Sequence, residues 1–397
     1  MAPRIAVVHE RFTEYGGSEA VVAEFLKIWP GSRVFAPIAT ADCVAAVRAA
    51  AADAHSAARE IAPVGSGSWT RGDEKPDDPT FLTTWLSRAH ALSGERSHAP
   101  LLPFVPGVLR RLPVRDADAV VVSHHAFATQ AALATDAPVI AYVHSPARWA
   151  WDPAFRAREA GGRAGQLALA TLGGLARRCE VRAAPKLAAA VANSRAVAER
   201  IERWWGTAAT VVYPPVRIDR FAPDPAVPRE DFFLFAGRLV PYKRPDLAVL
   251  AAREAGVRLV VLGDGRFRDR LEAVAGPETT FLGAAPDDVL LDMYRRCRAL
   301  LMPGVEDFGI VPVEAMACGT PVLAVGAGGA LDTVRPGISG QLLEVGDDTT
   351  VITEFARAMR DFDPTAYNPH AVRTHAESFS PNAFRTRMAA IVSEALD

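Results

Sequence analysis

The sequence predicts an α/β protein built from two doubly wound, Rossmann-like domains. Three observations lead to this prediction. Short apolar, β-branched runs alternate with Ala-, Arg- and Glu-rich helical stretches, these runs fall into two blocks, and a proline-rich segment separates the blocks. Continuous apolar strands separated by helices are typical of parallel sheets that helices cover on both faces. Two such blocks indicate two domains, which a chain of 397 residues can accommodate.

Ten apolar runs form the predicted strands. They cover residues 5–8, 119–122, 139–143, 187–192 and 210–212 in the first block, and residues 232–235, 258–262, 280–282, 299–302 and 321–325 in the second. Prolines are concentrated between Pro214 and Pro228. Because proline fixes φ, lacks an N–H group and disfavours helix, we expect this segment to connect the two domains.

Composition and charge exclude several classes of protein. Half of the residues are hydrophobic and 23% are charged, which excludes a disordered chain. Lys and Arg total 44 against 46 Asp and Glu, so the basic surplus of a dedicated nucleic-acid-binding protein is missing. No apolar run approaches the roughly 20 residues of a membrane-spanning helix. We therefore expect a soluble, cytoplasmic protein, and leave open a peripheral contact with the inner face of the membrane.

Neither the cysteines nor a pair of aspartates form a metal motif. The cysteines, at positions 43, 179, 297 and 318, lack CxxC spacing, so we expect reduced thiols and neither a zinc framework nor a disulfide set. Asp116 and Asp118 form a DxD pair, but they precede their strand, whereas a metal-binding DxD follows one. The sequence therefore predicts no metal site.

The most informative segment runs from Glu306 to Gly319. It follows an apolar strand, Pro312 suits the first turn of a helix, and Gly319 suits the stop at its end. Glu306 is then expected in a loop at the carboxyl edge of a sheet, where ligands of open α/β sheets bind, and Glu314 in the first turn of the helix. A carboxylate there can simply stabilise the helix, by about 0.3–1 kcal/mol. Two carboxylates around a glycine-containing loop instead suit a polyhydroxylated ligand whose phosphates lie on the helix N–H groups.

A second segment at a strand end carries positive charge. Gly237, Arg238 and Lys243 follow the first strand of the second block. The glycine lets the backbone approach a ligand and the two cations suit a diphosphate, although taken alone the segment would be a solvated basic turn. Gly263 and Asp264 follow the next strand in the sequence GDG, but the third glycine of the dinucleotide motif GxGxxG is absent.

The first block offers weaker candidates. Gly16 and Gly17 follow the first strand, and a helix that opens on two glycines can cradle a phosphate or admit a sugar, although such a pair is also common in ordinary turns. His144 follows a strand end, as do His124 and His125. A histidine there can face a ligand, but it is more commonly a loop residue satisfied by its neighbours.

In their order and spacing, these motifs resemble those of one enzyme family. The paired glycines, the Arg238 and Lys243 clamp, LGDG after a strand of the second block, and Glu306 and Glu314 spaced as E(x7)E resemble the family 4 retaining glycosyltransferases with the GT-B fold. The segments YVHSPARWAWD, FAGRLVPYKRPDLAV, EDFGIVPVEAMACGTPV and GAGGALDTV are similar to those of the WbaZ-like bacterial mannosyltransferase branch associated with O-antigen and related polysaccharides. The resemblance covers nearly the whole chain and is loose only between residues 61 and 113.

The resemblance implies two domains that face a central cleft. The acceptor domain covers residues 1–214 and the nucleotide-sugar donor domain residues 215–379, while a final helix over about residues 380–397 packs back on the first domain. The implied donor-binding residues are Gly16, Gly17, Gly237, Arg238, Lys243, Gly263, Asp264, Phe308, Gly309, Ile310 and Glu314. The implied catalytic residues are Glu306, His144, Arg238 and Lys243. Neither a metal nor another cofactor is implied.

The implied activity is the transfer of a hexose, with retention, to a hydroxyl of a glycan, glycolipid or small-molecule acceptor. Mannose from GDP-mannose is the first expectation, and a UDP- or other nucleotide sugar used in natural-product glycosylation is the alternative. In this interpretation Arg238 and Lys243 hold the diphosphate, Glu314 the ribose and Glu306 the sugar. A NAD-dependent oxidoreductase, against which the incomplete GxGxxG argues, and a non-catalytic nucleotide-sugar-binding subunit also stay open. Residues 61–113 suit either acceptor recognition or membrane contact.

Overall fold

The computed structural model describes residues 3–52, 79–95, 97–153, 155–156 and 162–397. The chain divides into two compact units. The first contains Met1–Asn193, Val197–Pro215 and Phe384–Asp397, and the second contains Ser194–Ala196 and Val216–Ala383. Part of the segment 61–113 that the sequence singles out, residues 61–78, lies outside the described residues.

The first unit is built on a parallel sheet of seven strands. They are β1 (Ile5–His9), β3 (Arg33–Phe35), β5 (Thr80–Leu82), β6 (Ala119–His124), β7 (Val139–Val143), β8 (Ala189–Ala192) and β9 (Thr210–Val211). Their spatial order is β5-β3-β1-β6-β7-β8-β9, so the chain reverses its direction of winding between β1 and β6. This is the doubly wound arrangement, and its ligands bind at the carboxyl ends of the strands beside the reversal.

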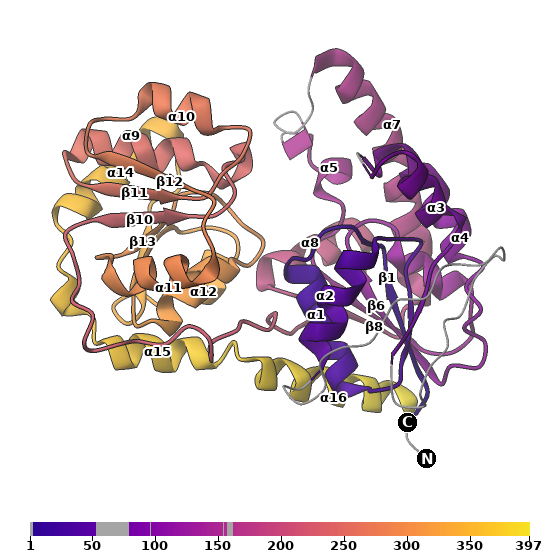
Figure 1. Ribbon diagram of the computed structural model, residues 1–397. Helices are drawn as coiled ribbons and strands as arrows, with labels where there is room; N and C mark the ends of the chain where they lie inside the picture. The colour runs from indigo at the N-terminus through magenta and orange to yellow at the C-terminus, as the bar shows by residue number, and fades with distance from the viewer. Residues whose placement is uncertain (1–2, 53–78, 96, 154, 157–161) are drawn as a thin grey trace. The chain divides into compact units, whose positions relative to one another are not determined.

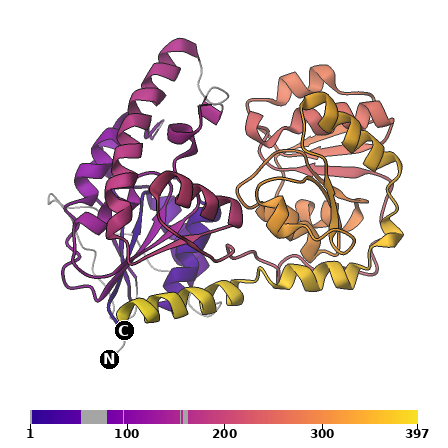
Figure 2. The same ribbon diagram turned by 180° about the vertical axis from the view of Figure 1, so that it is seen from behind.

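Helices cover both faces of this sheet (Figures 1 and 2). One face packs against α1 (Gly17–Ile28), α2 (Ala41–Ala51) and α16 (Pro381–Leu396). The other packs against α3 (Trp85–Leu92), α4 (Val105–Leu109), α5 (Arg148–Trp151), α7 (Gly162–Ala183) and α8 (Arg195–Trp205). Alternate residues of the strands enter the two cores, as in β1, where Val7 faces the first set of helices and Val8 the second.

The second unit repeats the plan with six parallel strands. They are β10 (Phe233–Ala236), β11 (Leu259–Leu262), β12 (Thr279–Gly283), β13 (Leu300–Met302), β14 (Val322–Val325) and β15 (Gly340–Leu343), in the order β12-β11-β10-β13-β14-β15. Its helices are α9 (Pro245–Ala255), α10 (Arg268–Val274), α11 (Asp287–Arg296), α12 (Ile310–Ala317), α13 (Ala330–Thr333), α14 (Asp348–Arg360) and α15 (Pro369–Glu377). Figure 1 shows α9, α10 and α14 on one side of the sheet and α11 and α12 on the other. The predicted fold class, two Rossmann-like α/β domains, is confirmed.

All ten predicted strands are present, most within one or two residues of their predicted ends. The sequence analysis missed β3, β5 and β15, and also β2 (Arg11–Phe12) and β4 (Ile38–Ala39), which pair with each other. These strands have two to four residues each, too few for an apolar run to stand out. Their pairing with neighbouring strands, such as that of β3 with β1, defines them as strands.

The final helix, α16, packs on the first unit. Phe384, Met388 and Val392 are fully buried in one of its cores, and the Phe384 ring stacks on Phe25 of α1 at 5.7 Å between centroids. The Arg385 guanidinium forms an ion pair with the Glu24 carboxylate at the edge of this contact. The last residues of the chain therefore complete the core of the first unit. No helix in the described parts of the chain is both long and apolar enough to cross a bilayer.

Candidate functional site

The predicted donor residues of the second unit include four that lie in loops at the carboxyl edge of its sheet. The reversal of winding lies between β10 and β13, which are neighbours in the sheet. Gly237, Arg238 and Lys243 come from the loop after β10, and Glu306 comes from the loop after β13. The two loops therefore flank the crevice where ligands of this fold bind.

Lys243 and Glu306 contact each other directly. The Lys243 ammonium donates a hydrogen bond of 2.8 Å to Glu306 Oε1, and both side chains are largely shielded from water, at 11% and 20% exposure. Arg238 is exposed at the same edge, and its guanidinium lies 3.5 Å from the Tyr242 hydroxyl. In the described part of the chain Arg238 makes no ion pair. The edge therefore carries one cation balanced by a carboxylate and a second cation open to an anionic ligand.

Glycines allow the loops at this edge to pack backbone against backbone. A Cβ on Gly263, whose φ is +136°, would lie 1.9 Å from the Gly237 carbonyl oxygen. A Cβ on Gly304 would lie 2.6 Å from the Lys243 carbonyl oxygen. No side chain fits at such separations. Gly263 therefore lets the loop after β11 approach the loop that carries Lys243, and Gly304 sets the distance between the loops that carry Lys243 and Glu306. The role of Gly304 is missed by the sequence analysis, because it depends on which loops are neighbours in space.

The helix after Glu306 begins earlier than predicted. Gly309 is its N-cap, with φ of 94°, and Ile310 is its first residue, so Glu314 lies in the second turn and the prediction of the first turn is wrong. The left-handed conformation of Gly309 turns the chain into the helix two residues before Pro312, which is the reason for the shift. Phe308 is buried against Phe379 and anchors this turn. The helix α12 follows Glu306 closely along the chain, and its first N–H groups carry partial positive charge.

Glu314 occupies a buried position. The residue is 8% exposed, and its Oε2 accepts a hydrogen bond of 3.2 Å from the Tyr294 hydroxyl. Burial raises the pKa of Glu314 to about 7, against the opposing effects of Arg217 and of the Tyr294 hydrogen bond. The carboxyl can therefore change its charge near neutral pH. Tyr294 is a partner that sequence spacing could not reveal, because it lies on α11, twenty residues before Glu314.

In the first unit, Gly16 and Gly17 form the start of α1 at the carboxyl end of β1. Both are exposed, and Glu19 Oε2 accepts a 3.1 Å hydrogen bond from the Gly16 N–H, which caps the helix. Glu19 Oε1 lies 3.1 Å from His9 Nε2. Burial would raise the pKa of Glu19, but the hydrogen bond and charge of His9 and the bond from Ser18 lower it to about 2. A permanent carboxylate thus lies behind the paired glycines.

His144 follows β7 at the same edge and is held on three sides. Its Nε2 lies 2.8 Å from Ser123 Oγ, its ring stacks on His125 at 4.5 Å, and its carbonyl accepts a 2.8 Å hydrogen bond from Asn193 Nδ2. Burial, together with the neighbouring His125 and His9, lowers the pKa of His144 well below 6.5. A neutral imidazole can accept or donate a hydrogen bond, but it does not supply a positive charge.

Two buried carboxylates fix the loops at this edge, and the sequence analysis missed both. Glu10 Oε1 accepts hydrogen bonds of 2.5–3.1 Å from the backbone N–H groups of residues 125–128. Glu180 Oε1 lies 3.0 Å from His124 Nε2 and accepts a bond from the Ala147 N–H. Both are buried, and each one holds a loop that follows a strand of the first sheet. Neither has a sequence motif, because their partners lie more than 30 residues away.

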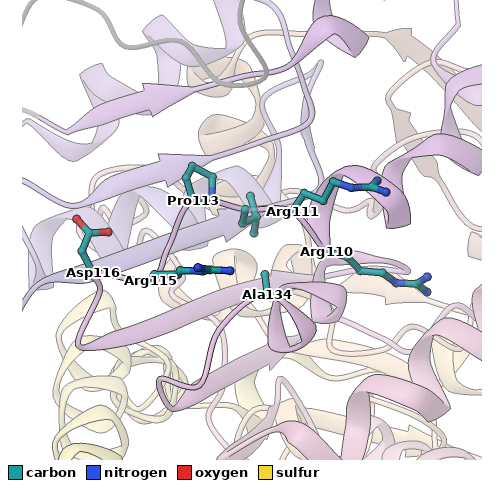
Figure 3. A pocket seen from close by; sticks show the side chains of 7 residues that line it. Arg110, Arg111, Pro113, Arg115, Asp116 and Ala134 are labelled. Carbon is teal, nitrogen blue, oxygen red and sulfur yellow. The ribbon is translucent and has the colours of Figure 1, made fainter.

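An arginine-rich pocket of about 560 Å³ lies at the other edge of the first sheet (Figure 3). Arg110, Arg111 and Arg115 line it, from the segment that precedes β6. Its position at the amino end of β6 separates it from the residues described above. The same segment contains the DxD pair, in which Asp116 is bound to Arg33 and Asp118 to Arg4.

Two protein-family models match the chain. Residues 218–368 match the glycosyl transferases group 1 model, and residues 70–220 match the Glycosyltransferase Family 4 model. The matches meet in the proline-rich connector, so each half of the chain is similar to one glycosyltransferase family model. The predicted enzyme class, glycosyltransferase, agrees with both.

The curated relatives are similar over part of their length. The D-inositol 3-phosphate glycosyltransferase of Thermobispora bispora is 33% identical over 217 residues, which make up 47% of this chain and 51% of the relative. The chain thus spans about half the length of the curated relatives it matches. These relatives are not named for mannosyl transfer, so the narrower resemblance to the WbaZ-like branch remains a prediction.

Solved structures share the fold over the whole chain. Anabaena HepE (Alr3699), in complex with UDP and glucose, aligns with a TM-score of 0.66 and 17% identity over 98% of this chain and all of that one. The sucrose-phosphate synthase of Thermosynechococcus elongatus aligns with a TM-score of 0.66 and 16% identity over 99% and 98% of the two chains. These likenesses show that the chain has the predicted GT-B fold.

Proposed function

We propose that this chain, in which a family 4 glycosyltransferase domain precedes a group 1 domain, is a retaining hexosyltransferase. It takes a hexose from a nucleoside diphosphate sugar and transfers it to a hydroxyl of a glycan, glycolipid or small-molecule acceptor. The observation that carries the proposal is the placement of Lys243, Glu306 and the start of α12 at the winding reversal of the second sheet. A crevice with cations, N–H groups and a carboxylate suits a ligand that carries both phosphates and sugar hydroxyls.

The donor site is assigned from the second unit. Arg238 and Lys243 hold the diphosphate, since both ammonium and guanidinium groups donate to phosphate oxygens. Glu306 accepts hydrogen bonds from sugar hydroxyls, and Glu314 accepts them from the ribose. The backbone at Gly237, Gly263 and Asp264 borders the ligand, as does that of Phe308, Gly309 and Ile310.

The charges at this edge fit the chemistry of glycosyl transfer. The bond between the anomeric carbon and the phosphate oxygen breaks, which develops positive charge on the sugar ring and negative charge on the departing nucleotide. Fixed cations and N–H dipoles at the leaving group stabilise that negative charge, and the loss of one such donor typically costs about 10²–10³ in rate. We assign attack to the acceptor hydroxyl on the face that the phosphate leaves. Its proton passes to the leaving phosphate, and the configuration is retained.

The first unit contributes the other assigned residues. Gly16 and Gly17 leave the backbone at the start of α1 free of side chains, which suits close approach to the donor phosphates. His144 is neutral at the carboxyl edge, which suits a hydrogen bond to a hydroxyl of the reacting sugar. We propose that the reaction is independent of metal ions, because the positive charge at the leaving group is supplied by Arg238, Lys243 and the α12 N-terminus.

The sequence motifs support a proposal for the identity of the sugar donor. Their similarity to the mannosyltransferase branch favours GDP-mannose. A UDP-sugar is the second candidate, because Anabaena HepE, with the same fold, binds UDP and UDP-glucose. The relatives' name adds an inositol phosphate to the acceptors worth testing.

Part of the segment 61–113 is assigned to the acceptor side. Trp85 and Phe104 contact each other edge to face at 5.8 Å, and each is about half exposed. Exposed aromatic rings suit a lipid-linked acceptor at the inner membrane surface. Flotation with phospholipid vesicles tests this point, because a protein that stays with the soluble fraction and acts equally well on a water-soluble acceptor contradicts it.

A panel of GDP- and UDP-sugars tests the proposed activity. A donor present at a hundredfold excess over its Kd stabilises the folded protein by about 2.7 kcal/mol, so a thermal shift identifies the base and the sugar. Release of the nucleoside diphosphate with EDTA present, measured with glycan, glycolipid and inositol phosphate acceptors, then tests turnover. Absence of both binding and release across the panel contradicts the proposal, and loss of activity with EDTA contradicts metal independence.

A further inference from the structure

Four side chains of the first unit form one continuous line of hydrogen bonds. Glu19 Oε1 lies 3.1 Å from His9 Nε2, His9 Nδ1 lies 3.0 Å from Ser123 Oγ, and the same hydroxyl lies 2.8 Å from His144 Nε2. His9 and Ser123 are completely buried and Glu19 is 7% exposed, so water does not compete along this line. His144 ends the line at the carboxyl edge of the sheet.

The sheet register places these residues side by side. His9 is the last residue of β1, and it is the direct partner of Ser123 in β6. Ser123 is in turn the partner of Tyr142 in β7, and His144 follows two residues later on the same side of the strand. Glu19 reaches His9 from the first turn of α1, where it also caps Gly16. The line therefore runs across β1, β6 and β7 beside the winding reversal.

We propose that Glu19, His9 and Ser123 act as positioning residues that hold His144 in the tautomer protonated at Nε2, with Nδ1 left as a hydrogen-bond acceptor. This proposal deepens the function proposed above and rests on it for the identity of the substrate. The acceptor nitrogen would take a hydrogen bond from a hydroxyl of the sugar or the acceptor. Among the described residues, His144 Nδ1 has no hydrogen-bond partner of its own.

The direction of each bond follows from the chemistry of the groups. A carboxylate only accepts hydrogen bonds, so a neutral His9 carries its proton on Nε2 and presents a lone pair at Nδ1. The Ser123 hydroxyl then donates its single proton to His9 Nδ1. Toward His144 it can only accept, so His144 must be protonated at Nε2. The hydrogen bond that Glu19 accepts from the Ser18 hydroxyl also lowers the pKa of Glu19 and helps to keep the start of the line ionised.

The stacked histidine supports the same arrangement. His125 lies 4.5 Å from the His144 ring with an angle of 13° between the planes, and burial lowers the pKa of His125 to about 4. Because stacking and burial disfavour a positive charge on either imidazole, His144 stays neutral and carries its proton on only one ring nitrogen. Without Ser123 nothing in the line would decide between the two tautomers.

The ¹⁵N chemical shifts of the His144 ring test the proposal, because protonated and unprotonated ring nitrogens have well separated shifts. The signal is assigned in labelled protein from its disappearance in His144→Gln. In the wild-type protein we expect a protonated Nε2 and an unprotonated Nδ1. In Ser123→Ala we expect averaged shifts from a mixture of tautomers, together with a fall in kcat of about tenfold, as for the loss of one hydrogen bond.

Ser32→Ala is the matched control. Ser32 is equally buried in the first unit and its hydroxyl donates to the Trp29 carbonyl, away from His144. We expect this variant to keep the wild-type His144 shifts and kcat, while its thermal stability changes by a similar amount. Glu19→Gln replaces the carboxylate, which can only accept a hydrogen bond from His9, with an amide that can also donate one. We therefore expect mixed His144 tautomers in this variant, in a protein that retains the start of α1.

Two results would overturn the proposal. One is a wild-type His144 protonated at Nδ1, since a doubly protonated His9 would keep its bond to Glu19 and reverse both bonds of the Ser123 hydroxyl. The other is a Ser123→Ala protein with unchanged shifts. Both results are read from chemical shifts and do not depend on sugar transfer. A fixed His144 tautomer in a protein without transferase activity would therefore contradict the proposed function but not the positioning of His144 by this line.

Discussion

The Lys243 ammonium lies 2.8 Å from Glu306 Oε1, and this pair joins the two loops on either side of the winding reversal in the second sheet. Glu306 uses one of the three N–H donors of Lys243, which leaves the others for a ligand. A diphosphate can therefore bind Lys243 without displacing Glu306. The pair aligns the ammonium group before the donor arrives, which reduces the ordering that binding requires.

Lys243→Met removes the charge and keeps much of the side-chain length. We expect kcat to fall by about 10²–10³, because one donor to the leaving phosphate is lost. Glu306→Gln should also lower kcat, and the double variant should lose less than the product of the two single effects, because the residues are in contact. Steady-state kinetics with the donor identified above provides the measurement.

Lys27→Met is the matched control for this series. Lys27 forms a comparable 2.7 Å ion pair with Glu24 on α1, and it belongs to no proposed site. Its replacement should leave kcat and the donor KM unchanged. If Lys243→Met behaves like Lys27→Met, the assignment of Lys243 to the diphosphate is wrong.

Gly263→Ala tests the backbone packing beneath the same site. The added Cβ would lie 1.9 Å from the Gly237 carbonyl oxygen, so one of the two loops must move. We expect a loss of stability of about 1–3 kcal/mol or more, and weaker donor binding, because the displaced loop carries Arg238 and Lys243. Calorimetric unfolding and donor titration are the measurements.

The control separates the clash from backbone strain. Gly256 also has positive φ, +67°, but an added Cβ meets no atom within 4 Å. Gly256→Ala should cost only the strain of the left-handed conformation, about 1 kcal/mol, and should leave donor binding intact. Equal donor affinities for the two variants would contradict the role given to Gly263.

The sequence predicted the second unit's site better than the first unit's. Arg238, Lys243 and Glu306 each follow an apolar strand by a few residues, so the edge they share could be predicted from local order alone. The contact between Lys243 and Glu306 required one more fact, that β10 and β13 are neighbours, which the doubly wound order provides. Glu314 was placed in the wrong turn because the cap at Gly309 depends on a backbone conformation that spacing does not reveal.

The hydrogen-bonded line in the first unit was beyond sequence analysis. Glu19, His9 and Ser123 carry no motif, and their contacts with each other and with His144 require the register of three strands to the exact residue. A shift of one residue in β6 would turn the Ser123 side chain to the opposite face of the sheet. Only the composition of the strand ends gave a signal, since His9, His124 and His144 all lie where parallel strands end.

The pKa of Glu314 predicts a pH-dependent stability. Burial raises this pKa from 4.5 to about 7, so between these values the folded protein holds a proton that the unfolded chain releases. Stability should therefore fall as pH rises from 4.5 to 7 and become level above that, with a total change of about 3 kcal/mol from this group. Glu314→Gln should abolish this part of the slope, while Glu377→Gln, at an exposed site, should retain it. Unfolding measured by calorimetry between pH 4.5 and 8 provides the test, and identical slopes for wild type and Glu314→Gln would contradict it.

Phe384 predicts how much the final helix contributes to the first unit. Its ring is 1% exposed and packs against both Phe25 and Tyr142, so Phe384→Ala leaves a cavity in the core and should cost about 3–5 kcal/mol. Leu396→Ala lies on the same helix at an exposed position and should change stability by less than about 0.5 kcal/mol. Helix propensities of ordinary residues differ by at most about 0.7 kcal/mol, so a difference of several kcal/mol between the variants measures packing and not helix formation. Hydrogen exchange locates the effect: faster exchange in β1, β6 and β7 of Phe384→Ala is expected, and exchange confined to α16 itself would show that the helix is an appendage to a core that is complete without it.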